Sequence, residues 1–567
     1  MTGIACITAR LGRYDAAVEA TLQDLDRQHL SERLWRKDPS LWKDDPAIQV
    51  NIMQRLGWLS IVSEMQTKAE GMMAFAESVK ASGVKTVVLL GMGGSSLCPE
   101  VLRKTFGVAE GYPELIVLDT TDPVTIRDAE SKIDLPHSLF LLASKSGSTI
   151  EMLSLYRYFA VKVEAMTGGE IGAYFMAITD PGSPLEALAR EKSFRKIFLA
   201  PSDVGGRYAA LTYFGLVPAA LIGIDLAAFL KRAEERIQNA SASLPADKND
   251  AVQLGAMLGR LWMEGCDKLT FITSDSLTHF GIWAEQLVAE STGKEGKGIV
   301  PIDGEDIGSP EVYGKDRLFV YLRDASDANE ARDAKVDALQ NAGHPTVRMA
   351  LQDPLDLAGQ FFLWEMATAV AAVVLGVNPF DEPNVSESKT NTGDVLKVFK
   401  TTGKLPLSAA VRVENDIAIA GSVKVDTSNA LDEAIPLFLS QLKPKAYLAL
   451  MVYLPMTERC EACLRLIRER IRTQYHIATT LGYGPRFLHS TGQLHKGGAP
   501  IGCFIQITAD DAEDMVIPNV GYSFGTLKRA QALGDFQALS QRGMPVLDIR
   551  LGRDTEAGLQ GLLSVLE

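Results

Sequence analysis

A short polar turn in the first third of the chain carries residue types suited to binding an anion. Ser144-Lys-Ser-Gly-Ser-Thr-Ile-Glu151 follows an apolar run at 138–143 and precedes a helical pattern that starts at Met152. A helix N-terminus presents unpaired backbone N–H groups and a partial positive charge, which suit a phosphate. The alternative is an ordinary helix cap, but a cap needs one hydroxyl and this turn has four. The turn therefore predicts phosphate binding.

A second turn of similar character precedes it. Gly91-Met-Gly-Gly-Ser-Ser96 follows the apolar run 84–90 and precedes a helical pattern at 99–106. One glycine-rich turn is weak evidence for a ligand. Two such turns at the carboxyl edge of one parallel sheet are stronger evidence, because ligands of open α/β sheets bind at that edge.

Two further segments place charged side chains beside glycines. In Val204-Gly-Gly-Arg-Tyr208, Arg207 could face a ligand that approaches the backbone closely, or it could form a structural ion pair. In Glu290-Ser-Thr-Gly-Lys294, a carboxylate at the end of a helical pattern adjoins a glycine turn. Such a carboxylate is usually solvated, so residue type alone does not decide its role.

Apolar strand patterns separated by helical patterns must position these turns. Such an alternation predicts a parallel sheet covered by helices on both faces. The predicted strands of the first sheet are 84–90, 114–120, 138–143, 173–178 and 196–200.

The regions on either side have a different character. Residues 1–75 read as helical, and we expect Trp35, Trp42 and Trp58 to anchor them to the rest of the chain. The segment 240–250 reads as a boundary, after which a strand at 268–273 opens a second α/β domain.

A weak internal repeat lies in the second half of the chain. The segment 338–351 returns as 538–551, and both copies keep Ala-Leu, Gly-x-Pro and a later Leu at the same spacing. Each copy reads as helix, turn and strand, and each follows another strand pattern, at 318–322 or 503–507. The repeat predicts a duplicated α/β unit.

Bulk composition narrows the class of protein. The 567 residues are 46% hydrophobic and 23% charged, which is typical of globular proteins, and the length implies several domains. No apolar run reaches the length of a membrane span, and the N-terminus lacks a secretory h-region. The net charge of −14 without a basic block argues against nucleic acid as the main partner.

The six cysteines are sparse for this length and favour a reducing, cytoplasmic environment. Cys460 and Cys463 form one C-x-x-C within a predicted amphipathic helix. Because no second pair completes a zinc site, we interpret them as part of the helix rather than as metal ligands. We predict no metal and no cofactor.

The motifs together resemble one family, the glucose-6-phosphate isomerases, which are built from sugar-isomerase (SIS) α/β domains. The resemblance spans roughly residues 35 to 567. Within the family, the sequence most resembles the isomerase half of the bifunctional transaldolase/glucose-6-phosphate isomerases, although a transaldolase half is not found in this sequence. The segments that carry it are 91–96, 144–149, 204–208, 290–294, 376–389 and 489–493.

The resemblance implies roles for individual residues. Glu290 would be the base that moves a proton between C1 and C2 through an enediolate, and Arg207 would stabilise the charge that develops. His489, with Lys389 nearby, would protonate and deprotonate the ring oxygen and O1. His495 is the competing histidine, and its spacing from the glycine turn fits the motif less well.

The same resemblance implies which residues hold the substrate. The predicted substrate-binding residues are Gly94, Ser95, Ser144, Lys145, Ser146, Thr149, Gly206 and Glu382. Glu382 stands where the family commonly has glutamine, so it could point away from the substrate or bind sugar hydroxyls. Hydroxyls and amides would hold most of the phosphate, which leaves the strong cations free for the reacting end of the sugar.

One departure concerns order along the chain. The family order is glutamate, histidine, lysine, whereas this chain has Glu290, Lys389 and then His489. In the family the histidine usually comes from the neighbouring subunit, so a homodimer is the family default. The relocated segment could supply it within one chain, which leaves a monomer open.

The sequence thus predicts an α/β protein with two SIS-type doubly wound parallel-sheet domains. We place a helical N-terminal segment at 1–75, a first SIS domain with the phosphate loop at 76–240 and a second SIS domain with Glu290 and Lys389 at 241–400. An additional C-terminal α/β region at 401–567 carries His489. The implied function is reversible isomerisation of glucose 6-phosphate to fructose 6-phosphate in glycolysis and gluconeogenesis. The alternative is a non-catalytic SIS-type protein that binds a sugar phosphate and regulates a partner.

Overall fold

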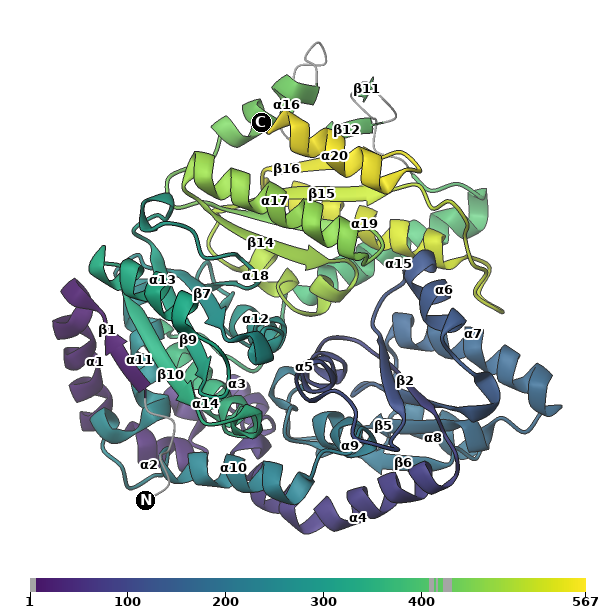
Figure 1. Cartoon of the computed structure of the whole chain (residues 1–567), viewed down its shortest axis with the longest axis horizontal. Helices are drawn as coiled ribbons and strands as arrows, with labels where there is room; N and C mark the ends of the chain where they lie inside the picture. The colour runs from purple at the N-terminus through teal and green to yellow at the C-terminus, as the bar shows by residue number, and fades with distance from the viewer. Residues whose placement is uncertain (1–6, 407–411, 415–416, 422–430, 567) are drawn as a thin grey trace.

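A computed structural model of the chain describes residues 7–406, 412–414, 417–421 and 431–566. Three β-sheets organise these residues, and helices cover each of them (Figure 1). The prediction of an α/β fold with two SIS-type sheets and a further C-terminal α/β unit is confirmed.

The first sheet has five parallel strands in the order β3-β2-β4-β5-β6. They are β2 (Thr86–Gly91), β3 (Glu114–Leu118), β4 (Ser138–Ala143), β5 (Phe175–Thr179) and β6 (Lys196–Leu199). All five predicted strands are therefore present, with boundaries shifted by a few residues at most.

Helices bury both faces of this sheet, as its continuous apolar strands predict. Val87 and Leu89 of β2 belong to one hydrophobic cluster, whereas the alternate residues Val88 and Leu90 belong to another. The covering helices are α4 (Ile61–Ala81), α5 (Leu97–Phe106), α6 (Pro123–Ser131), α7 (Ile150–Thr167), α8 (Pro184–Glu191) and α9 (Tyr213–Leu221).

The second sheet has the order β1-β10-β9-β7-β8. Its strands are β1 (Ile7–Arg10), β7 (Lys268–Thr273), β8 (Val300–Ile302), β9 (Arg317–Asp324) and β10 (Thr346–Leu351). Its helices are α10 (Leu226–Gln238), α11 (Asp250–Met263), α12 (Phe280–Thr292), α13 (Glu330–Asn341) and α14 (Leu357–Leu375). The predicted strand at 268–273 coincides with β7.

The N-terminal segment differs from the prediction at one point. It contains the helices α1 (Asp15–Arg27), α2 (Leu30–Trp35) and α3 (Pro46–Met53), but β1 is a strand that pairs antiparallel with β10. Its tryptophans anchor it as expected. The Trp42 indole donates to the Ala369 carbonyl at 2.9 Å, and the Trp35 indole donates to Ala240. The predicted domain boundaries near 75, 240 and 400 stay predictions.

The long apolar helix of the second unit corrects one expectation from composition. Within the described residues, the helix at Pro354–Leu375 is long and apolar enough to cross a membrane. However, 89% of its apolar window is buried inside the structure, because α14 packs against α10, α11 and α12. Its composition is therefore that of a core helix.

The third sheet has the order β11-β12-β16-β15-β13-β14. Its strands are β11 (Arg412–Glu414), β12 (Ile417–Gly421), β13 (Tyr447–Tyr453), β14 (Ala478–Tyr483), β15 (Gly502–Ala509) and β16 (Val546–Leu551). The helices of this part are α15 (Val385–Thr402), α16 (Leu431–Ser440), α17 (Glu458–Tyr475), α18 (Gly492–Gly497), α19 (Phe524–Gln541) and α20 (Thr555–Val565).

Both copies of the internal repeat adopt the predicted helix, turn and strand. In one copy α13 leads into β10, which pairs in parallel with β9, and in the other α19 leads into β16, which pairs in parallel with β15. Gly343 and Gly543 occupy equivalent turns with φ of 89° and 67°, a conformation that glycine adopts without strain.

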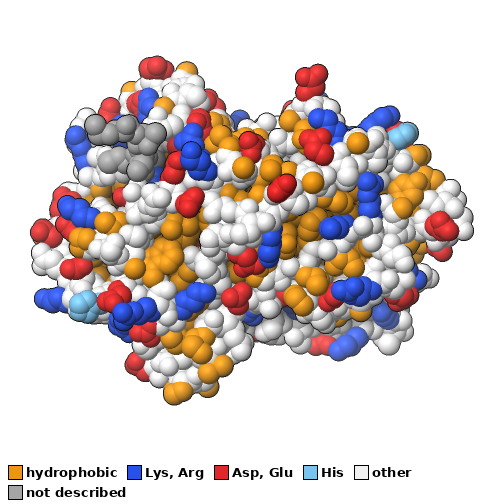
Figure 2. All heavy atoms as spheres, turned by 90° about the horizontal axis from the view of Figure 1, so that it is seen from below, with side chains coloured by type: hydrophobic (Ala, Val, Ile, Leu, Met, Phe, Trp, Pro, Cys, Tyr) orange, Lys and Arg blue, Asp and Glu red, His pale blue; other side chains and the backbone are white. Residues whose placement is uncertain are grey.

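We call the part built on the third sheet the C-terminal unit. It lies against the two units built on the first and second sheets (Figure 1). On the face shown in Figure 2, acidic and basic side chains are interspersed.

Candidate active site

Three motifs that are distant in sequence meet through their glycines. A Cβ atom built on Gly94 would lie 2.0 Å from the backbone oxygen of Gly206, so the first glycine turn contacts the Arg207 turn directly. A Cβ atom on Gly93, whose φ is 55°, would lie 2.7 Å from the backbone oxygen of His489. The absence of side chains here permits these approaches.

At this junction Glu290 and Arg207 form a buried pair. Arg207 lies in the short helix Gly206–Tyr208, and its Nη1 is 3.4 Å from Oε1 of Glu290, near the end of α12. The side chains are 4% and 10% exposed. Burial raises the pKa of Glu290, the charge of Arg207 opposes this shift, and the nearby Glu382 adds to it. The pair thus combines a carboxylate prepared to accept a proton with a fixed positive charge.

The segment 376–384 fixes the guanidinium of Arg207. Arg207 donates to the carbonyls of Pro379 and Asp381, the latter at 2.8 Å, and to the hydroxyl of Ser291 at 3.0 Å. Its Nη1 also donates to Oε2 of Glu382 at 3.1 Å, although that side chain is 46% exposed. Glu382 therefore points toward the arginine.

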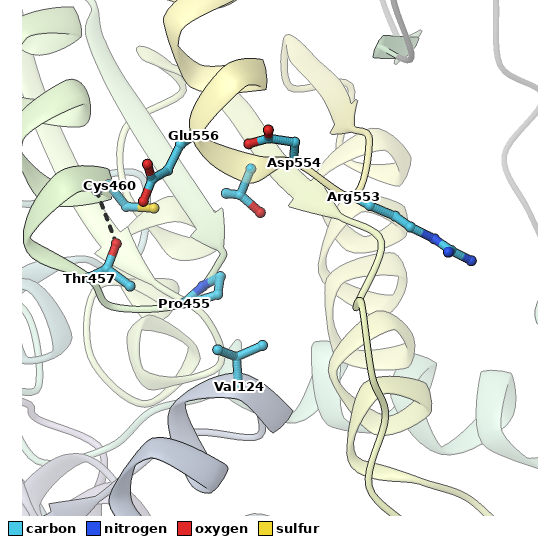
Figure 3. A pocket seen from close by; sticks show the side chains of 8 residues that line it. Val124, Pro455, Thr457, Cys460, Arg553, Asp554 and Glu556 are labelled. Carbon is cyan, nitrogen blue, oxygen red and sulfur yellow. Dashed lines mark hydrogen bonds between the residues drawn. The ribbon is translucent and has the colours of Figure 1, made fainter.

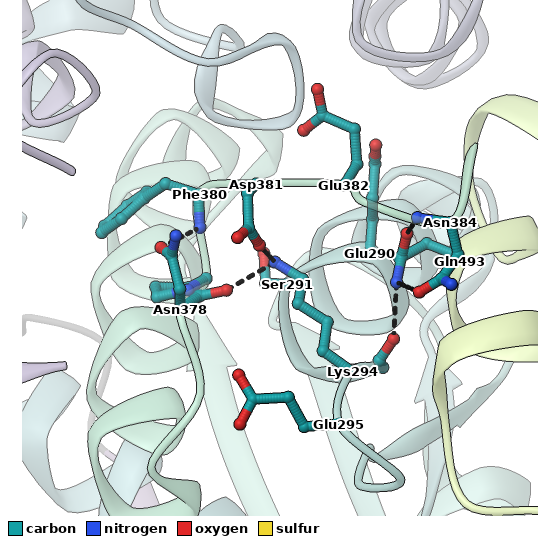
Figure 4. A network of polar contacts seen from close by, with 12 residues as sticks. Glu290, Ser291, Lys294, Glu295, Asn378, Phe380, Asp381, Glu382, Asn384 and Gln493 are labelled. Carbon is teal, nitrogen blue, oxygen red and sulfur yellow. Dashed lines mark hydrogen bonds and ion pairs between the residues drawn. The ribbon is translucent and has the colours of Figure 1, made fainter. Parts of the chain in front are cut away.

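A second buried cation, Lys294, lies in the same network (Figure 4). Its Nζ donates to the Asn378 carbonyl and pairs with Asp381 at 2.7 Å. Burial and the charge of Arg207 lower the pKa of Lys294 to about 8. Lys294 ends the segment Glu290–Lys294, but its sequence pattern did not predict a role for it.

One amide joins the carboxylate to the histidine segment. The Nε2 of Gln286 donates to Glu290 Oε2 at 3.1 Å and to the backbone oxygen of His489 at 2.8 Å. Gln286 precedes Glu290 by four residues, which is one helical turn and the same face of α12. That spacing could have revealed this residue, which sequence reasoning missed.

The imidazole of His489 contacts the phosphate-loop helix. Its Nε2 lies 3.0 Å from Oε1 of Glu151, which also accepts a bond from Gln531 at 2.7 Å. Glu151 is buried, which by itself raises its pKa, but His489 and Lys389 outweigh burial and the net pKa is lowered. Glu151 ends the first polar motif, yet its role was not predicted.

Lys389 and His495 lie in different surroundings, the first exposed and the second buried. Lys389 lies exposed on α15, and its charge reaches Glu151. His495 is buried among the rings of Tyr447, Phe487 and Phe504. Burial lowers the pKa of His495 to about 3, so the neutral ring belongs to the core. This placement favours His489 over His495.

The predicted phosphate loop is a compact turn with paired hydroxyls. Ser144 and Thr149 share a bond of 2.9 Å, Ser146 and Ser148 share one of 3.1 Å, and the Ser144 hydroxyl accepts from the Gly147 N–H. Each hydroxyl pair uses one proton between two oxygens and leaves the other proton for a ligand. This turn follows β4, and the glycine turn at 91–96 follows β2. Because β2 and β4 are adjacent and parallel, both turns lie at the same edge of the first sheet.

Of the other predicted substrate-binding residues, Lys145 has a structural partner and Ser95 is buried. Lys145 pairs with Asp180 at 2.6 Å, and burial lowers the pKa of Lys145 despite that partner. Ser95 is buried in the glycine turn, beside Gly94.

A separate groove of about 520 Å³ lies between α6 and the C-terminal unit (Figure 3). Its lining comprises Val124, Pro455, Thr457, Cys460 and residues 553–556. None of the predicted site residues lies in it. Cys460 and Cys463 sit on α17 as predicted, and the described residues contain no cluster of three or more His, Cys, Asp or Glu that could hold a metal.

The structure is an α/β fold with two SIS-type parallel-sheet units. Residues 55–307 match the family model described as phosphoglucose isomerase. The glucose-6-phosphate isomerase of Campylobacter jejuni is 28% identical over 355 residues, which cover 55% of this chain and 86% of that protein. That of Rubrobacter xylanophilus is 27% identical over 424 residues, covering 66% and 94%.

Solved structures share the fold. A hypothetical protein from Thermus thermophilus superposes with a TM-score of 0.58 and 24% identity, covering 70% of this chain and 100% of that one. A glucose-6-phosphate isomerase from Chlamydia trachomatis gives 0.54 and 18%, covering 71% and 90%. The likeness to one half of a bifunctional transaldolase/isomerase stays a prediction.

Proposed function

We propose that the protein interconverts glucose 6-phosphate and fructose 6-phosphate, as the names of its relatives suggest for them. The observation that carries the proposal is the buried Glu290–Arg207 pair, 3.4 Å apart, at the meeting point of the glycine turns. Under this proposal the enzyme acts in the cytoplasm, in glycolysis and gluconeogenesis.

The phosphate would bind at the Ser144–Thr149 turn, where hydroxyl protons and the N-terminus of α7 favour an anion. Glu290 would then carry a proton between C1 and C2 of the open-chain sugar. A raised pKa suits this work, because a base is most effective when its pKa lies near the working pH. Arg207 would stabilise the enediolate as its negative charge develops, and it is already fixed by five hydrogen bonds.

Ring opening requires a proton at the ring oxygen and the loss of one at O1. His489 would perform both transfers, with Glu151 holding one ring nitrogen and so fixing the tautomer and the ring plane. Lys389, exposed and close enough to influence Glu151, would approach the same end of the sugar.

The test is a coupled assay of fructose 6-phosphate to glucose 6-phosphate. Glu290→Gln should lower kcat by about 10²–10⁴-fold, because it removes the acid–base group and keeps the shape. The matched control is Glu295→Gln, on the turn after α12, whose side chain pairs with Lys43. A wild-type protein that binds 6-phosphogluconate without turnover would instead support the sugar-phosphate sensor.

We further propose that each site is complete within one chain. Within a single chain Glu290 contacts Arg207 and Glu151 contacts His489, although His489 belongs to the C-terminal unit. Gln286 joins the two pairs by bonding to Glu290 and to the His489 backbone. A mixture of co-expressed Glu290→Gln and His489→Ala chains should therefore remain inactive. Recovery of about a quarter to a half of wild-type activity in mixed dimers would show that the partner subunit supplies the histidine.

A further inference from the structure

An ion pair that no catalytic assignment uses lies three residues before His489. Arg486 Nε donates to Asp119 Oδ2 and Arg486 Nη2 donates to Asp119 Oδ1, both at 2.7 Å. The Asp119 side chain is 2% exposed, and that of Arg486 is 21% exposed. The bond is therefore the two-pronged kind, which fixes the orientation of the guanidinium as well as its position.

The pair joins the helix that carries His489 to the edge of the first sheet. Arg486 and His489 are the first and last residues of the 3-10 helix Arg486–His489, a single turn whose ends lie about 6 Å apart along its axis. Asp119 directly follows β3, at the carboxyl edge where the two predicted phosphate-binding turns lie.

The same carboxylate also holds the first glycine turn. The hydroxyl of Ser96, which is fully buried, donates to Asp119 Oδ2 at 3.1 Å and lies 3.2 Å from the Gly93 carbonyl. Gly93 in turn approaches the His489 backbone. Asp119 thus binds both the glycine turn, through Ser96, and the helix that carries His489, through Arg486.

We propose that Arg486 and Asp119 form a latch that positions the His489 imidazole against Glu151. They are positioning residues, because neither contacts the groups assigned to the reaction. Only the expected change in kcat rests on the proposed function. The effect of the latch on the orientation of the His489 ring does not depend on that function.

A purely structural role would make the pair one tie among several between the units. Other contacts already join them: Lys528 pairs with Asp122 at 2.7 Å, and Thr121 donates to Gln531 at 2.8 Å. Cohesion of the units therefore does not depend on Arg486. What the pair adds is a fixed end for the helix that bears the histidine.

Arg486→Lys keeps the charge but replaces two directed bonds by a mobile point charge. We expect kcat for fructose 6-phosphate to fall about 10- to 100-fold with KM within about twofold, the size of effect typical of a misplaced catalytic group. In the His489→Ala background the same change should alter kcat by less than about twofold. An equal loss in both backgrounds would overturn the proposal.

The matched control is Arg127→Lys. Arg127 on α6 pairs with Glu513 of the C-terminal unit, so it joins the same two units through a partner outside the helix Arg486–His489. This variant should retain wild-type kcat, and thermal unfolding should show that both lysine variants remain folded.

A readout independent of turnover separates this proposal from the proposed function. With 13C at the histidine Cε1 carbons, the seven histidines give at most seven signals, and the signal missing from His489→Ala is assigned to His489. Arg486→Lys should shift or broaden that signal, whereas Arg127→Lys should leave it unchanged. An unshifted His489 signal in Arg486→Lys would refute the latch, even if the wild-type enzyme is active. Absence of wild-type turnover would refute only the function.

Discussion

Replacing Glu382 by glutamine should move the pH dependence of activity in a direction that the structure fixes. Glu382 and Glu290 both contact Nη1 of Arg207, at 3.1 Å and 3.4 Å. Their carboxylate oxygens are therefore at most about 6.5 Å apart, by the geometry of two contacts to one atom. The negative charge of Glu382 raises the pKa of Glu290, in addition to burial, which is the larger cause. Glu382→Gln removes that contribution and leaves the burial.

The magnitude follows from Coulomb's law. Two unit charges about 6.5 Å apart interact by about 2.5 kcal/mol at an effective dielectric of about 20. Because the Glu382 side chain is 46% exposed, solvent screening reduces this figure, and we take about half of it. The pKa of Glu290 should therefore fall in Glu382→Gln.

The assay is kcat/KM against pH for fructose 6-phosphate in the wild type and the variant. The base must be ionised to accept a proton, so activity is lost as the pH falls through the Glu290 pKa, which lies above the ordinary value. Loss of the neighbouring charge favours the ionised form, so the acidic limb should move to lower pH. The substrate phosphate titrates identically in both proteins and cancels in the difference.

Glu295→Gln is the matched control, because its side chain is similarly exposed at 51% and pairs with Lys43 rather than with Arg207 (Figure 4). Its acidic limb should coincide with that of the wild type. An acidic limb in Glu382→Gln that stays in place, or moves to higher pH, would refute the assignment of Glu290 as the titrating base.

Three further predictions concern residues whose surroundings are clear. His489→Ala should lower kcat by about 10²–10⁴-fold with little change in Tm, whereas His495→Ala should chiefly lower Tm, because it leaves a cavity among aromatic rings; kinetics and thermal unfolding of both variants check this. Gly94→Ala should fold poorly or lose activity, measured by soluble yield and kcat, since its Cβ would lie 2.0 Å from the Gly206 carbonyl oxygen. Burial raises the pKa of Glu365 well above its ordinary value, so stability should fall as the pH rises from the ordinary glutamate range toward that raised pKa; Glu365→Gln, compared by urea unfolding at pH 5 and 8, should show a smaller decrease.

The strands of the first sheet could be predicted because each is an uninterrupted apolar run bounded by polar turns. The pattern failed where a segment takes its structure from a distant partner. Residues 7–10 contain no long apolar run, and they form β1 only because β10 offers an unpaired edge. The segment 1–75, which reads as helical, is interrupted between α3 and α4 for a similar reason, since Gly57 accommodates the side chain of Asp203 within 2.5 Å of its ideal Cβ position.

The candidate site shows the same limit. Motif spacing could indicate candidate residues such as Glu290, because a charged side chain beside a glycine turn forms a recognisable pattern. Motif spacing could not indicate Arg486, since arginines are common and its role depends on the carboxylate that lies beside it. Lys294 and Glu151 were within the quoted motifs, but only burial revealed that each is a charged group without access to solvent.

The order of the motifs along the chain explains why a C-terminal unit is present at all. A histidine segment placed after Lys389 needs its own scaffold to return to the first sheet, and the unit built on β13, β14, β15 and β16 provides it. His489 lies between β14 and β15, at the carboxyl edge of that sheet, which faces the carboxyl edge of the first sheet through Asp119 and Glu151. Such a site depends on contacts between edges rather than on chain order. The contacts at that junction should therefore tolerate chain rearrangement but not a change in side-chain geometry.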